Sequence, residues 1–260
     1  MYFRNVVPSC FFEGLIFFYF MAKKTYDESA IKTLSPLEHI RKRTGMYIGR
    51  TGNGSDYNDG IYVLLKEVLD NAIDEFISGY GKSVNIKIEN NLVTIRDYGR
   101  GIPLGKVIDC VSQINTGGKF NDDVFQFSVG MNGVGTKAVN ALSTYFKVRS
   151  TRDGEFFEAI FKEGVLQSQN SGTSTERNGT FVEFTPDDTI FKNYKFQDEH
   201  IERRIRLSSY LNAGLSINYN GTVFRSEEGL LDLLNDEVQF EKLYQPFYFK
   251  DKTSALISLA

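Results

Sequence analysis

The segment of residues 64–76, L-L-K-E-V-L-D-N-A-I-D-E-F, constrains the fold of this chain more than any other. Its acidic and amide side chains recur at the spacing of one helical stripe, which consists of Glu67, Asp70, Asn71, Asp74 and Glu75. The opposite side is apolar and consists of Leu64, Leu65, Val68, Leu69, Ala72, Ile73 and Phe76. The pattern predicts a helix within residues 58–78 that packs its apolar side on a core.

The acidic stripe has two interpretations. Most charges on a helix belong to a solvated face. Alternatively, a cation lies against the stripe, because Mg²⁺ commonly takes one or two protein oxygens and completes its shell with water and phosphate. The amide oxygen of Asn71 suits such a ligand, and a carboxylate one turn away could orient a water molecule.

Residues 83–97 predict a β-hairpin, S-V-N-I-K-I-E and L-V-T-I-R-D joined by Asn90-Asn91. Because strand side chains alternate, Asp97 continues the inward apolar row of the second strand. A buried carboxylate is costly unless it accepts hydrogen bonds. The donors could be N–H groups of the following loop, Y-G-R-G-I-P (98–103), in an Asx-type turn. They could also belong to a ligand such as the exocyclic amine of adenine, with Thr180 as a second polar group.

A glycine-rich region follows at residues 116–135 and enters a helical pattern at residues 136–145. Glycines before a helix suit the binding of phosphate. The run from Gly130 to Lys137 has the length of a P-loop, but its lysine is misplaced. The run from Gly133 to Ala138 matches the dinucleotide motif G-x-G-x-x-A, which requires a parallel βαβ unit. A flexible loop without a ligand is the remaining interpretation.

The rest of the chain alternates short strands with few helices. Strands are predicted at 146–151, 155–162, 180–185, 214–219 and 222–225, and a helix at 197–212. The hairpins favour an α+β fold in which a mostly antiparallel sheet carries helices on one face.

Charge, cysteine spacing and hydropathy give no sign of a nucleic-acid-binding, disulfide-rich or membrane protein. The net charge of −3 over 260 residues gives no overall basic footprint for nucleic acid. Cys10 and Cys110 lie far apart and form no metal-type spacing, which fits a reducing, cytoplasmic location. The apolar run at 10–20 is shorter than the roughly 20 residues of a membrane helix, so no membrane is predicted. Residues 1–22 are expected to form an extension outside the fold, and Met21 is a second candidate start.

Five segments in order resemble the GHKL ATPases: E-V-L-D-N-A-I-D-E, D-Y-G-R-G-I-P, T-G-G-K-F, G-M-N-G-V-G-T-K-A-V-N-A-L-S and N-G-T-F-V-E-F. The segments R-K-R-T-G-M-Y-I-G (41–49) and Y-D-E-S-A-I-K (26–32) narrow the resemblance to the ATPase domain of the type IIA DNA topoisomerase B subunits, gyrase B and topoisomerase IV B. The resemblance implies a two-layer α/β sandwich of the Bergerat type over residues 23–226. Residues 227–260 would then begin an incomplete transducer domain.

The resemblance also implies the site. Glu67 would be the general base that activates water, Asn71 would hold Mg²⁺, and Asp97 would accept the adenine amine. The other nucleotide-binding residues would be Tyr26, Gly101, Ile102, Gly117, Gly118, Lys119, Asn132, Gly133, Val134, Gly135 and Thr180. The base pocket would be supported by Asp74, Glu75, Arg100 and Arg152, with Arg100 as the ion-pair partner of Glu75.

The implied function is an ATP- and Mg²⁺-dependent dimerising ATPase, whose N-terminal arm carries Tyr26 into a second copy of the chain. Gyrase A or topoisomerase IV A, together with DNA, would be partners of the full-length protein. The sequence ends before the transducer lysine that contacts the γ-phosphate in this family, so slow turnover and no strand passage are expected from this chain alone. S-V-G-M-N-G (128–133) also departs from the family pattern. The alternatives are a non-catalytic nucleotide-binding or interaction remnant of the same fold and a nicotinamide-dependent oxidoreductase.

Overall fold

The computed structural model describes residues 27–28, 31–118, 129, 133–238, 246, 249–251 and 257–259. The chain divides into two compact units, Met1–Leu34 and Ser35–Ala260, and the fold described below is that of the second unit. The predictions for residues 1–22, Tyr26, Lys119 and Asn132 lie outside the described residues. Among the helices of the described part, none has the length and apolar content that crossing a membrane requires.

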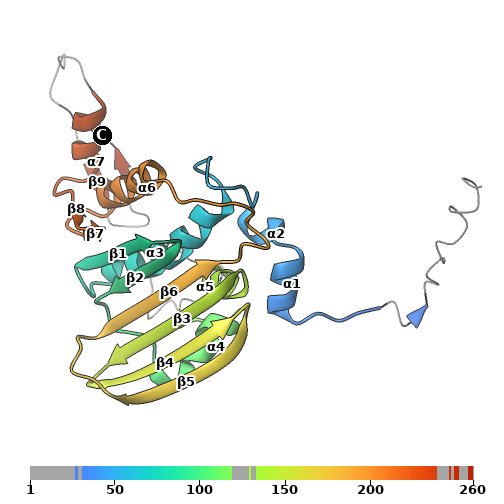
Figure 1. The fold of residues 1–260 in the computed structure, drawn as a ribbon. Helices are drawn as coiled ribbons and strands as arrows, with labels where there is room; N and C mark the ends of the chain where they lie inside the picture. The colour runs from blue at the N-terminus through green and yellow to red at the C-terminus, as the bar shows by residue number, and fades with distance from the viewer. Residues whose placement is uncertain are drawn as a thin grey trace, which may run out of the picture. The chain divides into compact units, whose positions relative to one another are not determined.

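An eight-stranded sheet organises this unit (Figure 1). Its order is β5 (Val165–Thr173), β4 (Glu155–Lys162), β3 (Ser143–Arg152), β6 (Gly179–Pro186), β2 (Leu92–Asp97), β1 (Ser83–Glu89), β7 (Ser216–Tyr219) and β8 (Thr222–Phe224). β1 and β7 run parallel, and the other neighbouring strands of this sheet pair antiparallel. The predicted mixed, mostly antiparallel sheet is therefore confirmed.

The hairpin of β1 and β2 forms where the sequence predicts it. Asn90 and Asn91 both have positive φ, 48° and 68°, as a two-residue hairpin turn with the right twist requires. The register pairs Ile86 with Ile95 and Val84 with Asp97, so Asp97 ends the inward row of its strand.

The helices are α1 (Pro36–Lys42), α2 (Gly45–Ile48), α3 (Gly60–Ile77), α4 (Val107–Ser112), α5 (Gly135–Ala141), α6 (Asp198–Leu211) and α7 (Leu230–Glu237). A 3₁₀ turn, η2 (Leu104–Lys106), precedes α4, and a short hairpin of β9 (Phe249–Asp251) and β10 (Ile257–Leu259) lies near the C-terminus. α3, α4 and α5 lie on the same face of the sheet (Figure 1).

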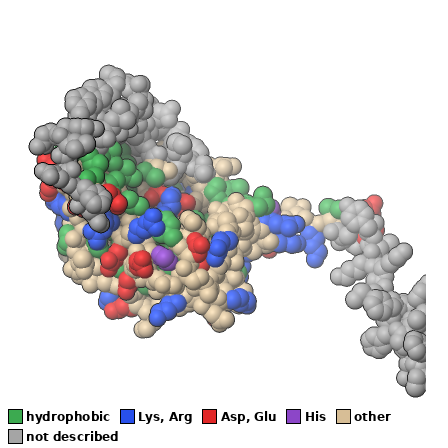
Figure 2. Space-filling view, turned by 90° about the horizontal axis from the view of Figure 1, so that it is seen from above, with side chains coloured by type: hydrophobic (Ala, Val, Ile, Leu, Met, Phe, Trp, Pro, Cys, Tyr) green, Lys and Arg blue, Asp and Glu red, His purple; other side chains and the backbone are tan. Residues whose placement is uncertain are grey.

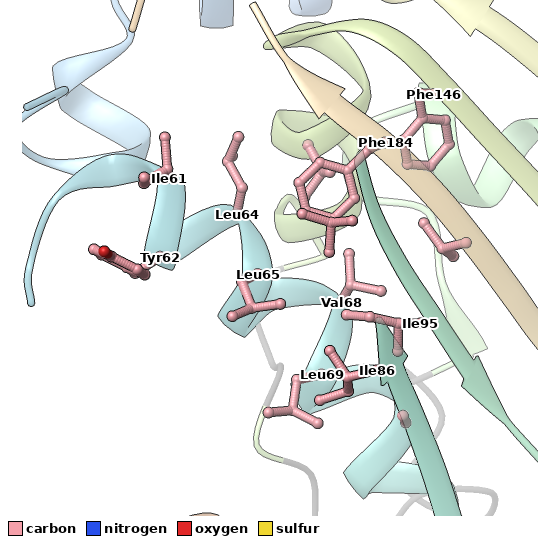
Figure 3. Close-up of a cluster of buried hydrophobic side chains, with 14 of the residues drawn as sticks. Ile61, Tyr62, Leu64, Leu65, Val68, Leu69, Ile86, Ile95, Phe146 and Phe184 are labelled. Carbon is pink, nitrogen blue, oxygen red and sulfur yellow. The ribbon is translucent and has the colours of Figure 1, made fainter. Parts of the chain in front are cut away.

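The apolar side of α3 forms the centre of the core. Figure 3 shows Leu64, Leu65 and Val68 of α3 among the side chains of the neighbouring sheet, which include Ile95 and Phe184. All five side chains are buried. Each contributes about 1.5–3 kcal/mol by leaving water. This packing fixes α3 against β2 and so fixes where its polar stripe can lie.

Several parts of the secondary structure differ from the sequence prediction, which did not include the helices α1, α2 and α4. The helix predicted to reach residue 145 ends at Ala141, because Ser143 already pairs with Pro186 in the sheet. β5 was not predicted, since its nine residues are all exposed and show no apolar alternation. Residues 227–260, predicted to begin an incomplete transducer domain, contain α7, β9 and β10 among their described residues.

α1 begins with a capping box and is tied to the core by an arginine. Ser35 and Glu38 exchange side-chain-to-backbone hydrogen bonds at the start of α1. Arg41 donates to the carbonyl of Ala141 at 2.7 Å and to Oδ2 of Asp187 at 2.6 Å. Arg41 is thus part of a polar network that joins α1 to the core.

Replacing Arg41 by Met should lower the free energy of unfolding by about 1–3 kcal/mol, because the buried Asp187 would lose its charged partner. Urea denaturation at pH 7 measures the change. The matched control is Arg43→Met, which removes the same charge from an exposed position two residues away. Equal stabilities of the two variants would contradict this account of α1.

Candidate functional site

A cavity of about 440 Å³ is lined by residues of α3, α4 and α5, of the strands β2, β3 and β6, and of the loops that join them. It brings together most of the residues singled out in the sequence. Those lining it are Glu67, Asn71, Glu75, Asp97, Arg100, Gly101, Ile102, Gly117, Gly118, Gly133, Gly135, Arg152 and Thr180. Val134 packs against the hydrophobic core instead.

The polar stripe of α3 is not a solvated face. Asp70 is 7% exposed and Asp74 is fully buried, while Glu67, Asn71 and Glu75 are half-buried. Asp70 pairs with Lys66 one turn away, and Asp74 accepts a hydrogen bond from the N–H of Val129 at 2.6 Å. The stripe therefore faces the cavity and the loops around it.

The carboxylate of Glu67 lies directly against the start of α5. A Cβ atom added to Gly135 would lie 1.8 Å from Oε2 of Glu67, so only glycine allows this approach. α3 and α5 therefore approach each other closely at this end of the cavity.

The amide of Asn71 is oriented by two donations. Its Nδ2 donates to the carbonyl of Glu67 and to Oγ1 of Thr136, both at 2.8 Å. Because the carbonyl of Glu67 can only accept, the nitrogen must be on this side of the amide and Oδ1 on the other. The sequence did not indicate Thr136, whose contact joins residues 65 positions apart.

Asp97 lies at the end of β2 and is 7% exposed. Its Oδ1 accepts hydrogen bonds from the N–H of Gly99 at 2.8 Å and from the N–H of Thr180 at 3.1 Å. The Asx-type turn foreseen for this residue is present, and the same residue lines the cavity. Burial raises the pKa of Asp97 to about 6, and the two backbone hydrogen bonds limit the rise.

The loop after Asp97 is held by an ion pair. Glu75 accepts from the backbone N–H of Arg100 at 2.8 Å and from Nη2 of its guanidinium at 3.0 Å. The guanidinium also lies 4.3 Å from the ring centre of Tyr80. Gly101 has a φ of +77°, and a Cβ atom there would lie 2.7 Å from the carbonyl oxygen of Thr151. The predicted pair of Arg100 and Glu75 is therefore present and fixes this wall of the cavity.

Comparison with known proteins places this site in a family. Residues 56–190, which include α3, the hairpin, α5 and β6, match the family described as histidine kinase-, DNA gyrase B- and HSP90-like ATPases. The chain belongs to this ATPase family. The family match spans the residues of α3, β2, α5 and β6 that line the cavity.

Relatives of this chain are B subunits of DNA topoisomerase 4 and of DNA gyrase. The B subunit of DNA topoisomerase 4 from Borreliella burgdorferi is 59% identical over 234 residues, covering 90% of this chain and 39% of that protein. The corresponding protein of Enterococcus faecalis is 37% identical, covering 84% of this chain and 35% of that protein. The B subunit of DNA gyrase from Mycobacterium tuberculosis is 37% identical, covering 76% of this chain and 30% of that protein. The chain thus spans less than two fifths of the length of these relatives.

A solved ATPase-family structure confirms the fold. The 43K ATPase domain of Thermus thermophilus gyrase B, solved in complex with an aminocoumarin, superposes with a TM-score of 0.69 at 29% identity. The match covers 84% of this chain and 59% of that one. The α+β fold with helices on one face of a mostly antiparallel sheet is therefore the fold of a gyrase B ATPase domain. The dinucleotide interpretation fails, because β3, which follows α5, is antiparallel to both of its neighbours.

Proposed function

We propose that this chain is the ATP-binding, ATP-hydrolysing and dimerising domain of the B subunit of a type II DNA topoisomerase. One observation carries the proposal: Asp97 on β2 and the pair of Glu67 and Asn71 on α3 line the same cavity of about 440 Å³. A purine could then occupy one end of the cavity while its phosphates reach the other.

The adenine end would be built around Asp97. An ionised carboxylate accepts a hydrogen bond from the exocyclic amine, and Thr180 and the backbone at Gly101 and Ile102 complete the polar contacts. The apolar side chains of Ile95, Val148 and Val182 also line the cavity and suit the faces of a purine. Glu75 and Arg100 would hold the loop in place, with Asp74 and Arg152 as further support.

The phosphate end would be built around Glu67 and Asn71. Glu67 takes a proton from water as the water oxygen bonds to the γ-phosphorus, and the bond to the β–γ bridging oxygen breaks with its electrons leaving on ADP. Gly117, Gly118, Gly133 and Gly135 line this part of the cavity and allow phosphates a close approach to the backbone. Lys119, Asn132 and the backbone of Val134, whose side chain packs against the core, complete the proposed phosphate-binding set. These residues would position the phosphates and neutralise their charge, which is chiefly what phosphoryl transfer needs.

The donor set fits a magnesium ion. The two donations from Nδ2 of Asn71 aim its amide oxygen away from those partners, and such an oxygen is a suitable Mg²⁺ ligand. Among the described residues no group of three or more histidine, cysteine or acidic side chains is placed to hold a metal ion. We assign Asn71 as the protein ligand of this ion on the orientation of its amide. The ion, when bound with ATP, would neutralise charge on the phosphates.

The wider assignments concern the full-length protein. We propose that residues 23–226 form the ATPase domain, that 227–260 begin a transducer domain, and that an arm carrying Tyr26 joins two copies into a dimer when ATP binds. Gyrase A or topoisomerase IV A, and DNA, would be partners in the cytoplasm. The face drawn in Figure 2 intermixes acidic and basic side chains, so we propose no DNA contact on that face.

Two measurements test the proposal together. Isothermal titration with Mg²⁺ and a non-hydrolysable ATP analogue should give one site per chain, and a phosphate-release assay should give slow turnover. Binding without release would favour the non-catalytic remnant. An absence of binding would contradict the proposed ATPase function. Addition of the chain should leave the fluorescence of NADH unchanged, because the chain is not expected to bind a nicotinamide cofactor.

Binding of adenosine should depend on pH through Asp97. Its pKa of about 6 in the folded chain lies above the ordinary value of 3.8, so the carboxylate that accepts the adenine amine is mostly ionised at pH 7.5 and mostly protonated at pH 5. We expect adenosine affinity to fall roughly tenfold between these pH values, measured by titration calorimetry. Adenosine has no phosphates whose titration would interfere.

The same shift predicts the direction of a stability effect. Because the folded pKa of Asp97 is raised, its contribution to the free energy of unfolding is fully present below about pH 4 and is lost as pH rises through about 6.

Asp97→Asn is the matched control for the adenosine titration, and its affinity for adenosine should not change between pH 5 and pH 7.5. A parent protein that binds adenosine equally at both pH values would contradict the proposed acceptor.

A further inference from the structure

Lys137 lies in α5 and is only 4% exposed, although lysine is rarely buried. It lines the same cavity, and its Nζ donates to the carbonyl of Thr116 at 2.6 Å. The sequence singles it out as a P-loop lysine in the wrong place. We propose that Lys137 binds the phosphate chain of the nucleotide as a positive group inside the cavity, which rests on the function proposed above.

The neighbours of Lys137 place it at the phosphate end. Gly135 rests against the carboxylate of Glu67, and Thr136 accepts from the amide of Asn71. The hydrogen bond to Thr116 ties the ammonium to the residue just before Gly117 and Gly118, which line the cavity. Lys137 therefore directly follows Gly135 and Thr136, the residues that contact Glu67 and Asn71. Asp97 and Thr180, at the adenine end, belong to other elements.

Other charged side chains line the cavity together with Lys137. Lys66 is paired with Asp70, and Arg100 is paired with Glu75. A polyphosphate that approaches Glu67 would be repelled by its carboxylate, and an ammonium in the lining of the same cavity reduces that repulsion. An ammonium group has three donors, and lysine commonly binds phosphate as a point charge. The carbonyl of Thr116 fixes the direction of one donor.

A series of ligands with increasing numbers of phosphates tests the proposal. The affinities of adenosine, ADP and a non-hydrolysable ATP analogue with Mg²⁺ would be measured by titration calorimetry on the parent and on Lys137→Met. The adenosine affinity should stay within about twofold, while the ADP and analogue affinities should fall roughly ten- to thirtyfold, as expected for a lost hydrogen bond from a charged group. Lys137→Arg, which keeps the charge, should retain most of the dependence on phosphate.

The control is Lys87→Met, which removes the same charge from a side chain on β1 that is 60% exposed. It should bind all three ligands as the parent does. Equal losses for the three ligands in Lys137→Met, or no loss, would overturn the phosphate role and leave the proposed ATPase function standing. A parent that binds adenosine but neither phosphorylated ligand would overturn both, whereas unchanged adenosine binding shows that the variant is folded.

Discussion

Replacing Glu67 by Ala is expected to lower the rate of ATP hydrolysis by about 10²–10⁴-fold, the usual contribution of a general base. The affinity for a non-hydrolysable ATP analogue should stay within about threefold of the parent. The reason is geometric: Glu67 lies at the α5 end of the cavity, against Gly135, while Asp97 lies on β2. Removing the base should therefore affect the reaction far more than the binding of the purine.

Glu67→Gln separates the chemical function of this side chain from its packing. The amide keeps the size of the carboxylate against Gly135 but accepts a proton far less readily. Both variants should therefore hydrolyse ATP equally slowly, as measured by phosphate release under saturating nucleotide. Glu89→Ala, an exposed acid on β1, is the control and should hydrolyse ATP as the parent does. Parental turnover in Glu67→Ala would show that another group activates the water.

Replacing Asp97 by Asn is expected to weaken the binding of adenine nucleotides by roughly 10- to 150-fold, because a hydrogen bond to a charged acceptor is lost. The backbone N–H groups of Gly99 and Thr180 both donate to Oδ1, so the oxygen of the new amide should take that position. The nitrogen would then present a donor to the adenine amine, which is itself a donor. The loss should therefore exceed that of a simple charge removal.

The same geometry predicts a change of base preference in Asp97→Asn. Hypoxanthine has a carbonyl where adenine has its amine, so the new amide nitrogen can donate to it. The ratio of ATP affinity to ITP affinity should fall at least tenfold relative to the parent, measured by titration with both nucleotides. Urea denaturation checks that the variant is folded. An unchanged affinity for ATP would contradict the proposed place of adenine.

The elements that the sequence predicted best are those set by local pattern. α3 follows from a helical apolar period, and the β1–β2 hairpin follows from alternation around Asn90-Asn91. The inward direction of Asp97 follows from the same alternation. α5 was predicted too long because its end is set by the pairing of Ser143 with Pro186, a contact between distant parts of the chain.

The site could be predicted only as far as local pattern or family resemblance reached. Periodicity tells which side chains of α3 share a stripe, but not that α5 and the residue Val129 cover that stripe. For the same reason Thr136 was missed as a site residue, and Lys137 was noted only as a lysine out of place for a P-loop. Their partners, Asn71 and Thr116, lie 65 and 21 residues away in sequence, and only the fold brings them together.

The most direct test is a crystal structure of this chain with Mg²⁺ and a non-hydrolysable ATP analogue. The account predicts that the adenine amine lies within hydrogen-bonding distance of Asp97 and that the γ-phosphate lies beside Glu67 and Asn71. An analogue bound outside this cavity, or bound in it with the purine at α5 and the phosphates at Asp97, would contradict the account.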